Sequence, residues 1–339
     1  MWGNSKSKMK RSIAVVSLSI TLAAAIVGCG SKDKLPGQGE LVSPPKASGG
    51  DAQAGNAAKK TAYPLKVKDA TGKEFVFTKA PERIASVSPA ETETLFALGL
   101  GDKVVGVSDF CDYPAEAKSK PKLGSIVKPN EEALIASGAD LVVTGVSMQL
   151  PAVEKLRGLK VNLFKLEPKT IDDVISNIRM MGQIFDRQEQ AEKLAASMEA
   201  DRKKVTDAVK DLTPEQKKKV FIEFSPGWTV GKGEFIDELI TVSGGVNVAS
   251  GEKGYVMISE EKIIAANPQV ILYPKNLIDD QSKKTIDQII RERSGWHKIE
   301  AVKTNKLAGV DKDTMSRPGP RITEALVEFA KGIYPERVK

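Results

Sequence analysis

One sequence unit occurs twice in this chain, as NEEALIASGADLVVT from Asn130 and as SEEKIIAANPQVILY from Ser259. Each copy has a capping residue, two glutamates, apolar residues at helical spacing, a Gly or Asn-Pro stop, and a run of branched apolar residues. This pattern predicts a helix, a tight turn and a buried strand. Glu261 follows Glu132 by 129 residues, whereas solenoid repeats recur about every 20 to 50 residues. The repeat therefore predicts two similar lobes, with an acidic helix start on each.

Strand and helix patterns alternate on both sides of a long charged segment. Apolar runs such as RIASV, DLVVT and VNLFKL precede this segment, and KVFIEF, QVILY and KLAGV follow it. The alternation predicts βαβ units and therefore a mostly parallel sheet with helices on its faces. A final helix is expected over residues 322–333.

The segment between these two halves has a helical pattern. From Ile171 to about Leu212, apolar residues recur at helical spacing among many charges, and Gly182 is the only Gly or Pro. We expect one long helix, broken near Asp186. The predicted fold class is therefore α/β, with two Rossmann-like lobes of mostly parallel sheets joined by one long helix.

The stretch SPAETETLFALGLG carries the boundary signals of a helix in the first lobe. Ser88 is a suitable capping residue, Pro89 suits the first helical position, and Glu91 is placed to complete a capping box. The glycines at 99 and 101 predict its end.

The first residues have the order of a secretory signal. A basic start is followed by an apolar run of 16 residues, Ser12 to Val27, which is shorter than the roughly 20 residues of a membrane-spanning helix. The tetrapeptide from Ile26 to Cys29 resembles the bacterial lipobox, with Ile26 where leucine is commoner. We expect a signal peptide over residues 1–28 and lipidation at Cys29; a plain secretory signal is the alternative.

The residues that follow predict a tether and then a folded body. From Gly30 to about Lys60, the chain is rich in Gly, Pro, Ala, Ser and Lys and has hardly a large apolar residue. We expect a lipidated N-terminus and tether over 29–61, an N-terminal lobe over 62–168, an interlobe helix over 169–214 and a C-terminal lobe over 215–339. With Cys29 lipidated, Cys111 has no partner for an internal disulfide, and it is interpreted as a small buried apolar side chain.

Charge and composition argue against a nucleic-acid partner. The formal charge of +7 includes four basic side chains within residues 1–28, whose removal leaves 47 basic and 44 acidic side chains, about +3. A nucleic-acid binder should instead carry a basic patch on a folded domain. The contents of 41% apolar and 28% charged residues are those of a soluble globular protein.

Signatures of catalysis are also missing from the sequence. The stretch GWTVGKG lacks the spacing of a phosphate-binding loop, and ALGLGDKVVG lacks that of a dinucleotide-binding loop. The one histidine, His297, is interpreted as a surface residue, so a zinc or manganese site has few candidate ligands. We expect no enzyme, no resident cofactor and no metal site, and a ligand that is a large preformed chelate or another organic molecule.

Five segments in order carry a family resemblance that covers essentially residues 62–339. They are PERIASVSPAETETLFALGLGDKVVGVSDFCDYP, NEEALIASGADLVV, EFSPGWTVGKGEFIDELITVSGG, SEEKIIAANPQVIL and SRPGPRITEAL. Together they resemble the class III substrate-binding lipoproteins of bacterial ABC importers, which include cobalamin, haem and ferric-siderophore binders. The resemblance implies two lobes linked by a rigid helix, a ligand held in the cleft between them, and little hinge motion.

The resemblance also implies ligand-binding positions. In α/β sheets, ligands bind beyond the carboxyl ends of the strands, and aromatic side chains there can lie flat on a macrocycle. By motif, Tyr113 and Tyr255 match aromatic cleft positions of cobalamin binders, and Asp313 and Arg317 match polar ones. Ile126 departs from the pattern, because a cobalamin binder can carry tryptophan there. The expected ligand-binding residues are Tyr113, Trp228, Tyr255, Asp313 and Arg317.

The repeated glutamates have two explanations. Acidic residues in the first turn of a helix complement its dipole by roughly 0.3 to 1 kcal/mol each. The resemblance implies, in addition, a dimeric permease with ATPase subunits, and a symmetric partner calls for matching contacts on both lobes. Glu132 and Glu261 match the family's docking glutamates, with Glu131 and Glu260 as neighbours that serve the dipole.

The expected function is therefore extracytoplasmic ligand capture. We expect a monomeric lipoprotein, anchored to the cell membrane, that delivers cobalamin or another corrinoid to an ABC importer. The alternatives are a ferric siderophore or haem receptor of the same class and, from another class, a secreted α/β enzyme, which would need a nucleophile-base pair or a metal cluster.

Overall fold

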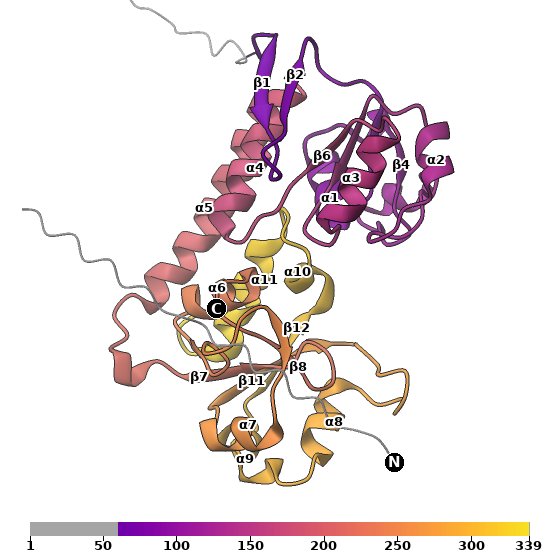
Figure 1. Cartoon of the computed structure of the whole chain (residues 1–339). Helices are drawn as coiled ribbons and strands as arrows, with labels where there is room; N and C mark the ends of the chain where they lie inside the picture. The colour runs from indigo at the N-terminus through magenta and orange to yellow at the C-terminus, as the bar shows by residue number, and fades with distance from the viewer. Residues whose placement is uncertain (1–59, 339) are drawn as a thin grey trace, which may run out of the picture. The chain divides into compact units, whose positions relative to one another are not determined.

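The computed structural model describes residues 60–338 and contains two lobes, each built on a four-stranded sheet (Figure 1). The expected signal peptide, Cys29 and nearly all of the expected tether lie outside the described residues. We propose the limits 62–168 for the N-terminal lobe, 169–214 for the connection and 215–339 for the C-terminal lobe. Between residues 60 and 338, no helix combines the length and apolar character needed to cross a membrane.

The sheet of the N-terminal lobe has the order β4-β3-β5-β6, and all its neighbouring strands are parallel. An antiparallel hairpin, β1–β2, precedes it and lies beside α4 (Ile171–Ile184; Figure 1). The strands are β1 (Leu65–Lys68), β2 (Glu74–Phe77), β3 (Ile84–Ser86), β4 (Val104–Val107), β5 (Leu141–Thr144) and β6 (Leu163–Lys165). The helices are α1 (Pro89–Ala97), α2 (Glu131–Ala136) and α3 (Leu150–Gly158), with short 3-10 turns at Gly101–Lys103 and Ala115–Ser119.

The sheet of the C-terminal lobe has the order β12-β11-β7-β9 and is also parallel. The remaining two strands, β8 and β10, form a small antiparallel pair. The strands are β7 (Lys219–Ile222), β8 (Trp228–Val230), β9 (Val246–Asn247), β10 (Tyr255–Met257), β11 (Val270–Lys275) and β12 (Leu307–Asp311). The helices are α6 (Phe235–Val242), α7 (Glu260–Ala266), α8 (Ile286–Glu292), α9 (Glu300–Lys303), α10 (Lys312–Ser316) and α11 (Ile322–Ile333), with 3-10 turns at Pro214–Gln216 and Trp296–Lys298.

The two sheets share one topology. In each sheet the first parallel strand in chain order lies between the second and the third, and the fourth lies outside the third. The repeated units α2–β5 and α7–β11 thus occupy the same place in their lobes. Asn130 accepts a hydrogen bond from the backbone of Ala133 at 3.0 Å, and Ser259 accepts one from Lys262 at 3.4 Å, so both copies are capped as predicted. The prediction of two similar α/β lobes is confirmed.

Two helices, α4 (Ile171–Ile184) and α5 (Gln188–Val209), form the connection between the lobes. The chain breaks between them at Asp186, which has a φ of 55°, where the break was expected. The helices then run antiparallel, since Arg179 of α4 pairs with both Glu192 and Glu199 of α5. The long helix of the prediction is therefore α5, with 22 residues, and α4 folds back against it.

The strands divide their side chains between different apolar clusters. Val142 packs in one cluster, whereas its neighbours Leu141 and Val143 pack in another, because successive side chains point to opposite faces of a strand. The largest cluster includes residues of both sheets, of α4, α5 and α11, and of the β1–β2 hairpin. The outer face of each sheet has a smaller cluster of its own. The two lobes therefore share one central core.

Candidate functional site

A cavity of about 330 Å³ is lined by residues of both lobes. The N-terminal lobe contributes loops at the carboxyl ends of its strands, including the start of α1 after β3 and the segments that hold Phe110 and Ile126. The C-terminal lobe contributes α10 and the residues after it, including Asp313 and Arg317. The cavity therefore lies where the sheet topology predicts a ligand, and we call it the interlobe cavity.

Arg317 is held by carboxylates from both lobes. Its guanidinium lies 3.0 Å from Glu93 and 2.8 Å from Asp112 of the N-terminal lobe, and 3.1 Å from Asp313 of its own lobe. Burial alone would lower the pKa of Arg317, but its hydrogen bonds with Asp112 and Glu93 and the charges of Asp313 and Asp112 outweigh this effect and raise it. Arg317 thus remains charged, lines the interlobe cavity and links the two lobes.

Glu93 receives a second arginine from the C-terminal lobe. Arg321 donates from Nε and Nη2 to the two carboxylate oxygens of Glu93, at 2.9 and 2.7 Å. Glu93 is buried, and such a two-pronged contact is among the stronger polar contacts in proteins. We call Glu93, Arg317 and Arg321 the interlobe clamp.

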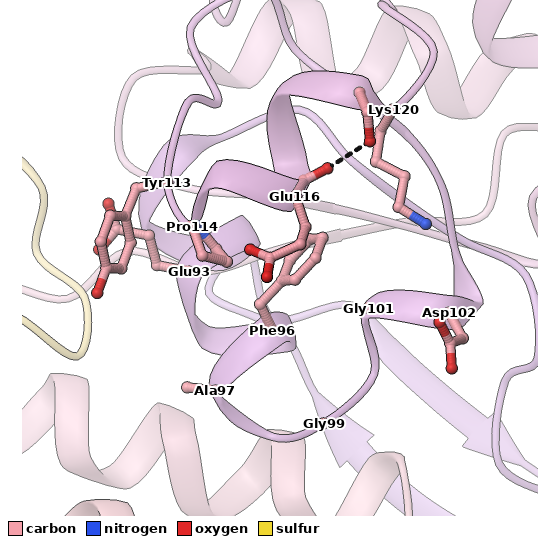
Figure 2. Close-up of a pocket in the computed structure, with 11 residues that line it drawn as sticks. Glu93, Phe96, Ala97, Gly99, Gly101, Asp102, Tyr113, Pro114, Glu116 and Lys120 are labelled. Carbon is pink, nitrogen blue, oxygen red and sulfur yellow. Dashed lines mark hydrogen bonds between the residues drawn. The ribbon is translucent and has the colours of Figure 1, made fainter.

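Tyr113 lies against this clamp but is not part of the lining of the interlobe cavity. Its ring centroid is 3.9 Å from Cζ of Arg321. Tyr113 lines a separate depression of about 600 Å³ on the N-terminal lobe, together with Glu93, Phe96 and Glu116 (Figure 2). The structure brings Asp313 and Arg317 together in the interlobe cavity but places Tyr113 beside it.

Trp228 and Tyr255 lie on the small β8–β10 pair of the C-terminal lobe. Trp228 is paired with Met257 across the two strands, and the alternation of side chains along β10 puts Tyr255 on the same face. Trp228 is 39% exposed, Tyr255 41% and Met257 64%. The ring centroids of Tyr255 and Phe224 are 5.3 Å apart, and the two rings are perpendicular. Desolvation and, to a smaller extent, the negative charge of Glu234 raise the pKa of the Tyr255 phenol. The three side chains form an exposed apolar surface, the aromatic platform, which suits a flat organic ligand.

Some residues of the site were not predicted in their roles. Ser88 is the N-cap of α1 and Pro89 follows it, as expected, but the Ser88 side chain makes no capping hydrogen bond. The capping box predicted with Glu91 is therefore wrong, because the Glu91 carboxyl is buried beside the interlobe cavity instead. The roles of Glu93 and Arg321 were also missed. The one local signal in the sequence was the run of four successive polar residues, 91–94, in the expected helix. The structure shows that all four are buried.

The repeated glutamates differ in their partners. Glu131 pairs with Lys155 at 2.5 Å, and Glu260 lies 3.5 Å from Arg293. Glu132 and Glu261, in the same first turns of α2 and α7, are exposed and have no ion-pair partner within residues 60–338. Each lobe therefore presents one paired and one unpaired carboxylate at an equivalent place.

The two remaining reactive side chains are not part of these sites. Cys111 is buried, with its Sγ 3.1 Å from the hydroxyls of both Thr92 and Ser108, and burial raises the pKa of its thiol. His297 is exposed. Over the part of the chain that the structure describes, no group of three or more His, Cys, Asp or Glu side chains is placed to hold a metal ion.

Two similar α/β lobes joined by a helical connection, with a cavity lined from both, define a bilobal binding protein. The chain belongs to the periplasmic binding protein family, whose pattern matches residues 84–314. This membership supports a role in substrate binding and transport and not in catalysis.

Comparison with individual proteins agrees with this assignment. The chain is 30% identical to an uncharacterised ABC transporter substrate-binding lipoprotein of Bacillus subtilis, YvrC, over 98% of this chain and 100% of the relative. It is similar to a periplasmic vitamin B12 binding protein of Vibrio cholerae, with 26% identity and a TM-score of 0.64 over 75% of this chain and 97% of the other. A periplasmic haem-binding protein of Roseiflexus sp. RS-1 is also similar, with 26% identity and a TM-score of 0.66 over 75% and 98%.

Proposed function

We propose that this protein captures a corrinoid of the cobalamin type in the interlobe cavity and delivers it to an ABC importer. The observation that carries the proposal is the cavity itself, which both lobes line at the carboxyl ends of their strands. A ligand held there touches both lobes, so its presence can be sensed by a partner that contacts both. The similarity to a vitamin B12 binding protein supports the ligand class.

The side chains around the cavity match a large, mostly apolar ring with polar substituents. Its volume of about 330 Å³ is at the lower end of the roughly 300 to 1,000 Å³ of small-molecule sites, so a corrinoid would extend beyond it. Phe110 and Ile126 offer apolar contact on one side, and we propose that Trp228 and Tyr255 of the aromatic platform extend this contact. Asp313 and Arg317 supply polar contacts within the cavity, and Tyr113 would contact the ligand only at its edge.

The absorption spectrum of the retained ligand tests the proposal. The purified body is incubated separately with cyanocobalamin, a ferric catecholate, a ferric hydroxamate and haem, and is then desalted. Only the cyanocobalamin sample should keep the ligand's absorption in a one-to-one ratio. Tyr255→Ala should weaken binding by about 1 to 3 kcal/mol, as for a contributing anchor, whereas Val76→Ala, on the β1–β2 hairpin, should not. Release of cyanocobalamin on desalting together with retention of another chelate would contradict the corrinoid assignment.

A haem or iron-chelate receptor is the second candidate. The haem-binding relative is as similar in sequence and fold as the vitamin B12 binding one, and Ile126 stands where a cobalamin binder can carry tryptophan. In this case haem or a ferric siderophore would remain after desalting. The same panel therefore decides between the two ligand classes.

We further propose that Glu132 and Glu261 dock the protein onto a dimeric permease. Their neighbours are paired with Lys155 and Arg293, so the local charge balance is met without them. Because α2 and α7 have equivalent places in lobes of one topology, the two free carboxylates can meet the same basic pocket on each half of a symmetric partner.

Anchoring at Cys29 completes the proposed function. Stable membrane attachment takes more than one acyl chain, which a lipidated N-terminal cysteine provides. We expect Cys29→Ser to release the folded protein from the extracytoplasmic face of the membrane. Equal membrane retention of both forms after fractionation would refute the anchor.

A further inference from the structure

Glu91 is a buried acidic residue in the lining of the interlobe cavity. It lies in the first turn of α1 and belongs to the lining of that cavity, yet its side chain is only 3% exposed. Among the described residues, no group donates a hydrogen bond to its Oε2. A buried polar atom without a partner weakens the folded state, and native proteins keep few of them. Such atoms are expected where function requires them.

The structure holds this carboxyl in a narrow place. Gly145, directly after β5, lies so close that an added Cβ would be 2.5 Å from Oε2 and 2.8 Å from Oε1. The same Cβ would be 2.8 Å from Oγ of Ser88, so the backbone at Gly145 and the Ser88 hydroxyl confine the carboxyl from two sides. Any larger residue at 145 would displace it. The structure therefore holds the Glu91 carboxyl against Gly145 and Ser88.

Two cations near the cavity, Lys165 and Arg317, have other partners, whereas Lys312 lines the cavity without an ion-pair partner among residues 60–338. The positive charge of Lys165 acts on the Glu91 carboxyl and opposes the rise of its pKa. The Nζ of Lys165 is nevertheless engaged elsewhere, at 3.1 Å from Glu167 and 3.2 Å from the Gly145 carbonyl oxygen. Arg317 is shared among three carboxylates. Burial, the largest influence, raises the pKa of Glu91 despite the opposite effects of Ser88, its own backbone N–H and Lys165. This favours the neutral carboxyl, which has one O–H donor and one free acceptor oxygen.

We propose that the Glu91 carboxyl binds a peripheral amide of the ligand, donating its O–H to the amide carbonyl and accepting the amide N–H. The inference rests on the proposed function and adds Glu91 to the polar ligand contacts proposed above. An amide matches the donor and acceptor pair of the carboxyl, and primary amides surround the ring of cobalamin. A carboxylate substituent, as on haem, offers acceptors only, so it could accept the O–H of Glu91 but would leave the acceptor oxygen of Glu91 without a donor. The ligand reaches the carboxyl when the lobes separate slightly or when Glu91 changes rotamer.

Two variants of Glu91 separate ligand binding from a structural role. Glu91→Gln keeps the size, an acceptor oxygen and a donor, whereas Glu91→Leu keeps the approximate size and removes both. Spectroscopic titration with cyanocobalamin should give an affinity within about threefold of wild type for Glu91→Gln and at least about tenfold weaker for Glu91→Leu. Glu116→Gln, in the separate depression shown in Figure 2, serves as the control for loss of an acidic side chain and should bind as wild type.

The melting temperature of the ligand-free protein is a second, independent measurement. Since Oε2 has no partner in the free protein, Glu91→Leu should melt at the wild-type temperature or above it. A lower melting temperature with unchanged affinity would show a structural role and overturn the inference, as would equal losses of affinity in both variants. If wild type retains no cyanocobalamin, the proposed function fails. The melting temperature of Glu91→Leu then still tests the role of Glu91. An increase supports a carboxyl that is kept for ligand binding, and a decrease refutes this role.

Discussion

Asp69, in the turn of the β1–β2 hairpin, is one of the residues that attach this hairpin to the N-terminal lobe. Its buried carboxylate pairs with Arg157 of α3 and accepts hydrogen bonds from the backbone of Lys165 at 3.0 Å and from the backbone and hydroxyl of Thr71 at 2.9 and 2.6 Å. Burial alone would raise the pKa of Asp69, but these hydrogen bonds and the charge of Arg157 outweigh it and lower the pKa. Asp69 therefore stabilises the folded protein in its ionised form.

The contribution of Asp69 should disappear in acid. A carboxyl whose pKa is lower in the folded protein stabilises it fully above the unfolded pKa of about 3.9, and this stabilisation is lost as the pH falls through the folded value. We expect Asp69→Asn to lower the free energy of unfolding by about 1.5 to 3 kcal/mol at pH 7, as for hydrogen bonds to a charged group, and by less near pH 3, where protonation of Asp69 in the unfolded chain reduces the stabilisation. Urea unfolding at the two pH values measures this.

A surface ion pair provides the control for this effect. Glu82 pairs with Lys103 at 2.9 Å with its side chain mostly exposed, and exposed pairs contribute little. Glu82→Gln should therefore leave unfolding nearly unchanged at either pH. An equal loss for Asp69→Asn at pH 7 and pH 3 would mean that its charge is not what stabilises the fold.

Residue roles that depend on distant partners could not be predicted from the sequence. Glu93 and Arg317 are separated by 224 positions, and no local pattern announces a contact of this kind. For Glu91 a local pattern exists but is misleading. Its position fits a capping box, yet its carboxyl packs beside Gly145, a contact that the sequence does not indicate. Motif similarity did place Asp313 and Arg317 beside the same cavity. It could not indicate that Arg317 forms ion pairs with three carboxylates.

At the level of elements, the packing of α4 against α5 depends on one glycine. A Cβ added to Gly182 of α4 would lie 2.5 Å from the Cβ of Ala191 of α5, closer than two such atoms can approach. Gly182 thus permits the close antiparallel contact between α4 and α5 on either side of the break at Asp186. Its position in a helix interior is otherwise unfavourable by roughly 0.5 to 1 kcal/mol relative to alanine.

A Gly→Ala substitution in a helix interior usually stabilises the folded protein, but at Gly182 we expect it to destabilise the protein. We expect Gly182→Ala to destabilise the protein by about 1 to 3 kcal/mol, the usual range for overpacking. Gly158→Ala, in α3, meets no atom within 4 Å and should be neutral or slightly stabilising. Thermal unfolding of both variants tests this, and Ala191→Gly should recover part of the loss in Gly182→Ala. A stabilised Gly182→Ala would show that the helices are not in close contact.

Elements with strong local signals were predicted well. The capped helices and branched strands of the repeated unit appear at α2–β5 and α7–β11, because caps, stops and apolar runs act within a few residues. The break near Asp186 was also expected. The direction of α5 after this break was not expected, since it depends on the contact between Gly182 and Ala191 and not on the periodicity of either helix.

For the whole molecule, the main prediction concerns docking onto a permease. We expect Glu132→Ala and Glu261→Ala to leave ligand affinity unchanged, because both carboxylates are exposed helix-start residues absent from the lining of the interlobe cavity. Each should weaken docking by about 2 kcal/mol or more if its partner charge is buried on assembly, and ligand uptake by cells should fall accordingly. The double variant should be worse than either, and arginine replacements worse still.

The neighbouring glutamates provide matched controls. Glu131→Ala and Glu260→Ala remove charges from the same helix turns, but these charges pair within their own lobes, so uptake should change little. Ligand binding and uptake are to be measured on the same variants. Normal uptake by the double variant, or parallel loss of binding and uptake, would refute the docking role.

The shared core has a consequence for the effect of proteolytic cleavage on the molecule. Its largest apolar cluster continues from Phe75, through α4 and α5, to Phe329 in the C-terminal lobe. A chain clipped between α5 and β7 would leave each half with a broad apolar face open to water, the kind of surface that promotes aggregation. We therefore expect neither half to fold stably by itself. Proteolytic cleavage at this junction should inactivate the whole protein and not release a functional lobe.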